Sequence, residues 1–124
     1  MLKRIDSPDT VVALEAVGKL VKDDYDNVLV PAIRQQIDGQ GEIRVVFVFG
    51  DQFEGLTLSG TASDAKLFVD ELVHRDLSKW KRCAVVTNLD WLRHSIAIFR
   101  WMMPGQIQVY ELPDLDMAIR WAAA

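Results

Sequence analysis

The sequence is poor in the residue types that build covalent or metal-bound sites. It has one cysteine and two histidines in 124 residues. A lone cysteine cannot form an internal disulfide, and the position of Cys83 in an apolar run predicts a small buried thiol. His74 and His94 are far apart, with no carboxylate at ligand spacing. We therefore expect no metal ion and no other cofactor.

Excess positive charge and long apolar runs are absent as well. The formal net charge is -4 and the pI is about 5.0, which gives no basic field for nucleic acid. No apolar run approaches the roughly 18 residues of a spanning helix, and the segment MLKRIDSPD has no signal-peptide core. These features predict a cytoplasmic protein that does not bind nucleic acid, and they leave peripheral membrane contact open.

Motifs for catalysis are also missing. The glycines between residues 50 and 60 fit neither a phosphate-binding loop nor a dinucleotide-binding turn, and no serine lies in a nucleophile elbow. The carboxylate pairs Asp23-Asp24 and Asp114-x-Asp116 occur where helices are expected to begin, so capping explains them better than acid-base chemistry. We expect no enzymatic activity.

What the chain does have is enough apolar surface for one core. Half of its residues are hydrophobic and 26% are charged, so burial can offset the entropy lost on ordering. The length suits a single domain covering residues 1–124.

The order of apolar patterns predicts an α/β fold with a mixed, mostly parallel sheet covered by helices. Pro31 falls inside the first helical pattern and predicts a kink at residues 27–31. Ligands in such sheets usually lie beyond the carboxyl ends of the strands, here the loops after Phe49, Val86 and Tyr110. The expected elements are a hairpin of residues 1–5 and 10–17 ended by Gly18, buried strands at 43–49 and 82–87, a further strand at 106–110, a loop at 50–63, and helices at 22–38, 64–76, 90–103 and 115–122.

The segment 90–103 predicts a strongly amphipathic helix. Its apolar face is expected to pack on the sheet as core and includes Trp91, Leu92, Ile96, Ile98 and Phe99. Trp101 falls on the polar face, close to His94. That tryptophan can pack on its own chain, lie in an oligomer interface or anchor at a membrane surface.

Four segments resemble the SpoIIAA-like proteins, small bacterial members of the STAS superfamily. They are DYDNVLVPA at residues 24–32, FEGLTL at 53–58, KRCAVV at 81–86 followed by Trp91, and MPGQIQVY at 103–110. The resemblance spans nearly the whole chain. It implies a four- to five-stranded mixed sheet with about four helices.

The SpoIIAA-like fold is similar to the CRAL-TRIO lipid-binding domain, in which hydrophobic ligands lie between the sheet and a movable helical element. That similarity implies a non-enzymatic domain that binds a small hydrophobic ligand or a membrane lipid through a movable helix. The expected contact residues are Tyr25, Leu29, Pro31, Phe53, Leu56, Leu58, Trp101 and Met102.

The alternative is a regulatory domain that binds a protein partner, as anti-sigma factor antagonists of the STAS superfamily do. Those proteins carry a phosphorylatable serine at a helix start, whereas here Ser59, Thr61 and Ser63 are candidate acceptors in a different pattern. A phosphate there would add charge at the favourable end of a helix dipole. Residues 59–63 can also be only a capped loop, and a homodimer stays open.

Overall fold

The computed structural model of the chain describes residues 1–57, 80–99 and 106–124, and these residues form a five-stranded sheet. Neighbours in sequence are neighbours in the sheet, in the order β1-β2-β3-β4-β5. β1 is antiparallel to β2, and the other neighbouring strands are parallel, as expected for a mixed sheet. The strands are β1 (Leu2–Arg4), β2 (Val12–Val21), β3 (Ile43–Thr57), β4 (Trp80–Thr87) and β5 (Gln106–Tyr110).

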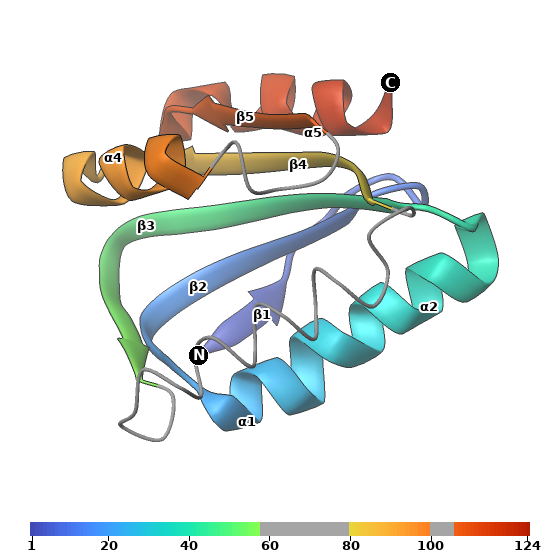
Figure 1. The fold of residues 1–124 in the computed structure, drawn as a ribbon, viewed down its shortest axis with the longest axis horizontal. Coiled ribbons are helices and arrows are strands. Elements are labelled where there is room, and N and C mark those ends of the chain that lie inside the picture. Colours follow the sequence, from blue (N-terminus) through green and yellow to red (C-terminus); the bar gives the residue numbers. More distant parts are fainter. Residues whose placement is uncertain (58–79, 100–105) are drawn as a thin grey trace.

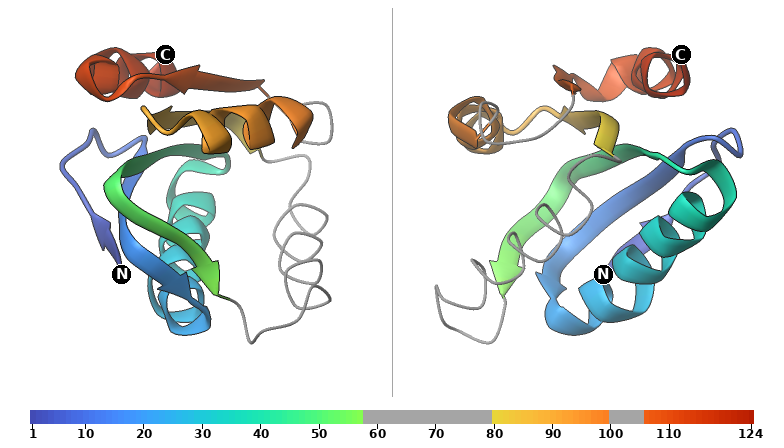
Figure 2. Two further views of the ribbon diagram at one scale, coloured as in Figure 1. Left: turned by 90° about the vertical axis from the view of Figure 1, so that its left-hand side faces the viewer. Right: turned by 45° about the vertical axis from the view of Figure 1, so that its right-hand side comes forward.

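Helices cover both faces of the sheet. One continuous helical segment lies beneath β2 and β3, while the last helix lies on the other face over β3 and β4 (Figure 2). The helix expected at residues 64–76 lies outside the described ranges, which hold slightly fewer helices than expected. The helical elements are α1 (Lys22–Asp24), the π-helix η1 (Tyr25–Leu29), α2 (Val30–Gln40), α4 (Asp90–Phe99), the 3-10 helix η4 (Leu112–Asp114) and α5 (Leu115–Ala123).

Successive residues of β3 alternate between two hydrophobic clusters, because neighbouring side chains of a strand point to opposite faces. Val45 belongs to the cluster under α2, and Val46 belongs to the cluster under α5. On α5, the small residues Ala118 and Ala122 are fully buried one turn apart, which lets this helix approach the sheet closely. The prediction that 43–49 is a strand buried on both faces is thus confirmed.

Pro31 sits at the start of α2, directly after the π-helical turn Tyr25–Leu29. Proline has no backbone N–H, so the α-helical bond to the carbonyl of Asn27 cannot form there. A wider π turn is one way in which a helix absorbs such an interruption. The irregularity predicted for residues 27–31 is therefore present as a change of helix type.

Two predicted strand ends are wrong. β2 continues through Gly18 to Val21, and β3 continues past Phe49 to Thr57. Between these strands the register moves from Ala16 opposite Phe49 to Gly18 opposite Phe53, so β3 carries extra residues in a bulge. Gly18 has a φ of 66°, a left-handed conformation that glycine adopts without strain. Glycine and polar residues favour a loop when the sequence is read alone, but here they form the bulge.

The buried side chain of Gln36 joins α2 to the beginning of the sheet. Its amide nitrogen donates to the carbonyl oxygens of Thr10 (2.9 Å) and Arg44 (2.8 Å), and its amide oxygen accepts the Arg44 N–H (3.0 Å). The Gln36 side chain thus pairs with both the N–H and the C=O of Arg44, as the backbone of a neighbouring strand would. At 5% exposure, few water molecules can replace these bonds.

The Gln36→Leu variant should lose about 3 kcal/mol of unfolding free energy, because three backbone groups lose their partner in a buried position. Urea unfolding measures this loss. The matched control is Gln35→Leu, an exposed neighbour on the same helix, which should change stability by less than about 0.5 kcal/mol. Equal effects of the two variants would contradict the role assigned to Gln36.

Two glycine substitutions separate backbone conformation from packing. A Cβ atom would meet nothing within 4 Å at either Gly18 or Gly39. Gly18→Ala should destabilise the protein by about 1 kcal/mol, since its positive φ strains any other residue. Gly39→Ala should stabilise α2 by about 0.5 kcal/mol, since alanine favours the helix. Thermal melts of both variants test the opposite signs, and a shared sign would refute the explanation.

Candidate functional site

The candidate site lies where β3 separates from β4. The pairing of β3 with β4 ends at Phe49 opposite Thr87, whereas its pairing with β2 continues to Thr57 opposite Val21. Figure 1 shows β3 curving away from β4 at this point, while the chain that leaves β4 turns into α4. Side chains from the end of β3 and the start of α4 meet in this region. Ligands commonly bind near such divergences at the carboxyl ends of parallel strands.

A row of four aromatic rings fills this position. We call Phe47, Phe49, Phe53 and Trp91 the aromatic row. Their ring centroids are 6.2 Å apart for Phe47–Phe49, 4.7 Å for Phe49–Phe53 and 5.9 Å for Phe53–Trp91. In a straight strand Phe49 and Phe53 would lie about 13 Å apart. The bulge in β3 therefore brings these two rings into contact.

The aromatic row runs from the core to the surface. Phe53 is 7% exposed, whereas Trp91 is 52% exposed and lies nearly parallel to the Phe53 ring, at an interplanar angle of 13°. The prediction that Trp91 is a core residue is wrong. The helical wheel assumes that sheet lies under every turn, but Trp91 is in the first turn of α4, just past the end of β4. Leu92, which follows it, does pack against the core under α2.

Polar contacts tie together the loops that follow β4 and β5. The Asn88 side-chain oxygen accepts the Leu112 N–H at 3.0 Å, and Arg93 lies 3.4 Å from the Glu111 carboxylate. The start of α4 is thereby held against the start of η4. Arg93 already has an acidic partner, which reduces the positive charge available beside Trp91 to an anionic ligand.

The structure places the predicted contact residues in different surroundings. Leu29 and Phe53 are brought together in the cluster under α2, although Phe53 comes from a strand and not from the expected loop. Pro31 is exposed on α2. The other predicted residues cannot be placed in this way. The structure describes the backbone but not the side chains of Tyr25 and Leu56. The last group lies wholly outside the described residues: Leu58, Ser59, Thr61, Ser63, Trp101 and Met102.

Two of the residues considered for catalysis, Asp24 and Cys83, are accounted for by the fold, whereas Asp114 is the N-cap residue of α5 but forms no side-chain capping hydrogen bond, so the capping predicted for it is not found. Asp24 accepts the Val21 N–H at 3.0 Å, as its predicted role at a helix start requires. Burial raises the pKa of Asp24, but the Val21 N–H and the Met1 amino group outweigh it and leave the pKa lowered. Cys83 is buried, and burial raises the pKa of its thiol to about 12. At neutral pH this thiol stays protonated and is a poor nucleophile.

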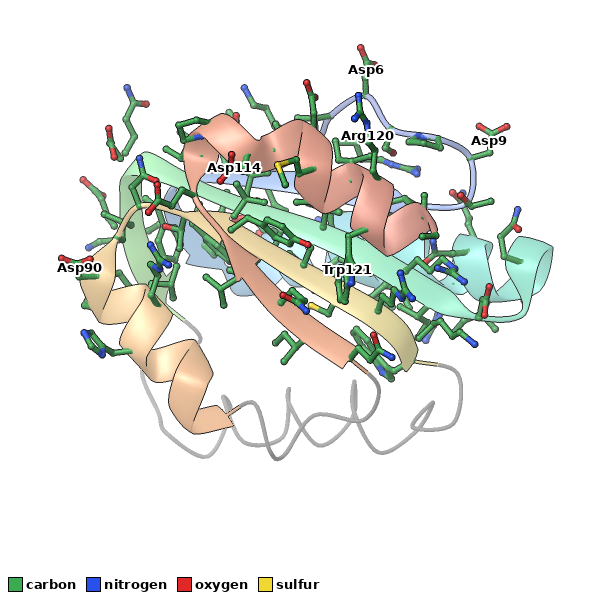
Figure 3. The ribbon with its side chains drawn as sticks, turned by 90° about the horizontal axis from the view of Figure 1, so that it is seen from above. Asp6, Asp9, Asp90, Asp114, Arg120 and Trp121 are labelled. Atoms are coloured by element: carbon green, nitrogen blue, oxygen red, sulfur yellow. The ribbon has the colours of Figure 1, made fainter. Side chains whose placement is uncertain are left out.

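Two strand arginines hold the end of α5. Arg44 donates to the Ala122 carbonyl oxygen (2.7 Å), and Arg82 donates to that of Trp121 (2.6 Å). The Arg82 guanidinium also lies 5.1 Å from the centre of the Trp121 ring, which points from α5 toward the strands (Figure 3). Cations at a helix carboxyl end satisfy free carbonyls and the helix dipole. These charges therefore stabilise the fold.

Within residues 1–57, 80–99 and 106–124, no group of three or more acidic, histidine or cysteine side chains is placed to hold a metal ion. Over the same ranges, no helix is long and apolar enough to cross a membrane.

Sequence reasoning missed Trp91 as a residue of the site. A signal for it exists in the chain, since Asp90 marks a helix start immediately after a buried strand, and a first-turn side chain there projects past the sheet edge. The contact between Phe49 and Phe53 had no such signal, because it depends on a bulge that involves two strands.

Comparison with known proteins gives a consistent picture. A family model described as SpoIIAA-like matches residues 11–123. A crystal structure of an uncharacterized protein of the DUF3478 family from Shewanella loihica PV-4, with a SpoIIAA-like fold, superposes with a TM-score of 0.68. The two sequences are 21% identical over 98% of this chain and 92% of the other. No curated protein matches the chain.

The raised pKa of Cys83 predicts very slow labelling by iodoacetamide at pH 8. Because the thiolate is disfavoured in the folded protein, modification should proceed only through unfolding and should speed up sharply in urea. Mass spectrometry at successive times measures the labelled fraction. The same protein in denaturing urea is the control, where a thiol of ordinary pKa reacts readily. Rapid labelling without urea would contradict the buried placement.

Proposed function

The chain belongs to the SpoIIAA-like family, and on that basis we propose that it is a non-enzymatic binding domain that holds a small hydrophobic ligand against the aromatic row. The observation that carries the proposal is the half-exposed Trp91 stacked on the buried Phe53. An exposed aromatic ring joined to a buried aromatic cluster offers apolar contact area without requiring the core to open.

Charge favours a small apolar ligand over an anionic membrane surface. The chain carries a formal charge of -4, and Arg93 close to Trp91 is paired with Glu111. Peripheral attachment to anionic lipid usually needs several free cations beside the apolar anchor. A neutral ligand needs none, so its binding would depend mainly on apolar contact and change little with salt.

Movement of α2 is not needed for this function. Gln36 binds that helix to β3, and Asp24 binds the beginning of the helical segment to the end of β2. Leu29, near the middle of the segment, is buried in the core. Lifting the helix would break all of these contacts together. We therefore propose that the ligand approaches beside α4, where Trp91 already reaches the surface.

A second proposal is a regulatory domain that binds a protein partner. It is supported by family membership, because a SpoIIAA-like domain is compatible with an anti-sigma antagonist type of role. Phosphate on Ser59, Thr61 or Ser63 in protein isolated from its host would favour this role. The absence of any bound apolar molecule in the same preparation would strengthen that choice.

Nile red, a neutral apolar dye, tests the ligand proposal. The Trp91→Ala variant should bind the dye about tenfold more weakly than the wild type, because it loses an aromatic contact and its buried area. Fluorescence titration measures the affinity. The matched control is Met117→Ala on α5, which removes a similarly exposed apolar side chain (58% against 52%) on the opposite face.

The controls decide between the outcomes. Equal binding by the wild type and Trp91→Ala would refute the proposed site. Loss of binding in Met117→Ala would show that the dye reports general surface hydrophobicity. Co-sedimentation with phosphatidylcholine or phosphatidylglycerol vesicles, lost in Trp91→Ala, would identify a membrane surface as the apolar partner.

A further inference from the structure

The two edges of the described sheet differ in how they are protected. β1 and β5 are the edge strands. β1 has three residues and carries Lys3 and Arg4, and Lys3 forms an ion pair with Glu15 at 3.1 Å. Short length and charged side chains are the usual means by which an edge strand avoids pairing with another chain. The β1 edge is thus protected.

The β5 edge lacks these protections. It has five residues, Gln106–Tyr110, with no charge and no proline among them. On one side it pairs with β4, and within the described residues no strand pairs with its other side. Backbone N–H and C=O groups along such an edge can accept one further strand.

We propose that β5 pairs antiparallel with β5 of a second copy of this chain, around a two-fold axis at Gln108. This register places Gln108 opposite Gln108 of the second copy, Ile107 opposite Val109, and Gln106 opposite Tyr110. The two sheets join into one continuous sheet across the axis. This proposal is independent of the ligand proposal. β5 lies on one side of β4, whereas β3, which carries most of the aromatic row, lies on the other side.

The pattern of side chains suits this register on both faces. Ile107 packs against the cluster under α2, and Tyr110 packs against the cluster under α5, so odd and even residues face opposite layers. Opposite residues of an antiparallel pair share a face. Ile107 and Val109 therefore meet as an apolar pair. The glutamine pair at the axis and the Gln106–Tyr110 pairs can form hydrogen bonds.

Self-complementarity favours a second copy over an unrelated peptide. A two-fold interface presents the same surface twice, so a charge at its centre would repel itself. The central residue here is the neutral Gln108, in a chain whose formal net charge is -4. A five-residue edge buries less area than a permanent dimer requires. The dimer should therefore be weak and depend on protein concentration.

Sedimentation of the full chain from about 1 µM to 1 mM should show a monomer-dimer equilibrium. The Gln108→Lys variant places two positive charges at the axis and should weaken the dimer at least about tenfold. Gln106→Lys is the matched control, since both glutamines are exposed on β5 but position 106 faces a tyrosine. Mixing Gln108→Lys with Gln108→Glu should restore dimers.

A Gln108→Cys variant checks the register directly. Cysteines at the axis should form an intermolecular disulfide in oxidised glutathione, whereas Gln106→Cys pairs lie about 13 Å apart and should not. The buried Cys83 does not compete. A wild type that is monomeric at all concentrations overturns the proposal. Equal disruption by both lysine variants, or equal crosslinking at both positions, also overturns it.

Discussion

The separation of β3 from β4 after Phe49 is the constraint on which the rest of the site depends. Up to that residue β3 is a central strand with both faces covered, and past it β2 is its only partner among the described strands. The bulge that accompanies the separation bends β3 and brings Phe53 back onto Phe49. Without that bend the Phe53 ring would be too far away to join Phe49 to Trp91.

The two covering helices are fixed by polar contacts at the opposite end of the sheet. Gln36 binds α2 to the first residues of β3, and the Arg44 and Arg82 side chains bind the end of α5. These contacts are directional and partly buried, so they define how each helix sits on its face. The carboxyl end of the sheet is left with the irregular pairing and the exposed aromatic ring. Polar attachment at one end and apolar exposure at the other support the proposed binding site beside α4.

Much of the fold could be predicted from local pattern. The strands at 43–49, 82–87 and 106–110 follow from apolar spacing, as do the first hairpin and the last helix, and the irregular helix around Pro31 follows from proline chemistry. The errors are at Gly18 and at residues 50–57, where glycine and polar residues favour a loop in any local analysis. Whether such residues form a loop or a bulged strand depends on the partner strand, which the local pattern does not contain.

The sequence by itself determined the alternation of strands and helices, the two-sided core and the inert buried thiol, because each depends on neighbouring residues and on burial. Only the tertiary structure decided the site. Phe53 and Trp91 are far apart in the chain and come from a strand and a helix, and their contact exists because β3 bends while β4 ends. Exposure of Trp91 was likewise decided in three dimensions, since a helical wheel shows which side of a helix is apolar but not where the sheet beneath it stops.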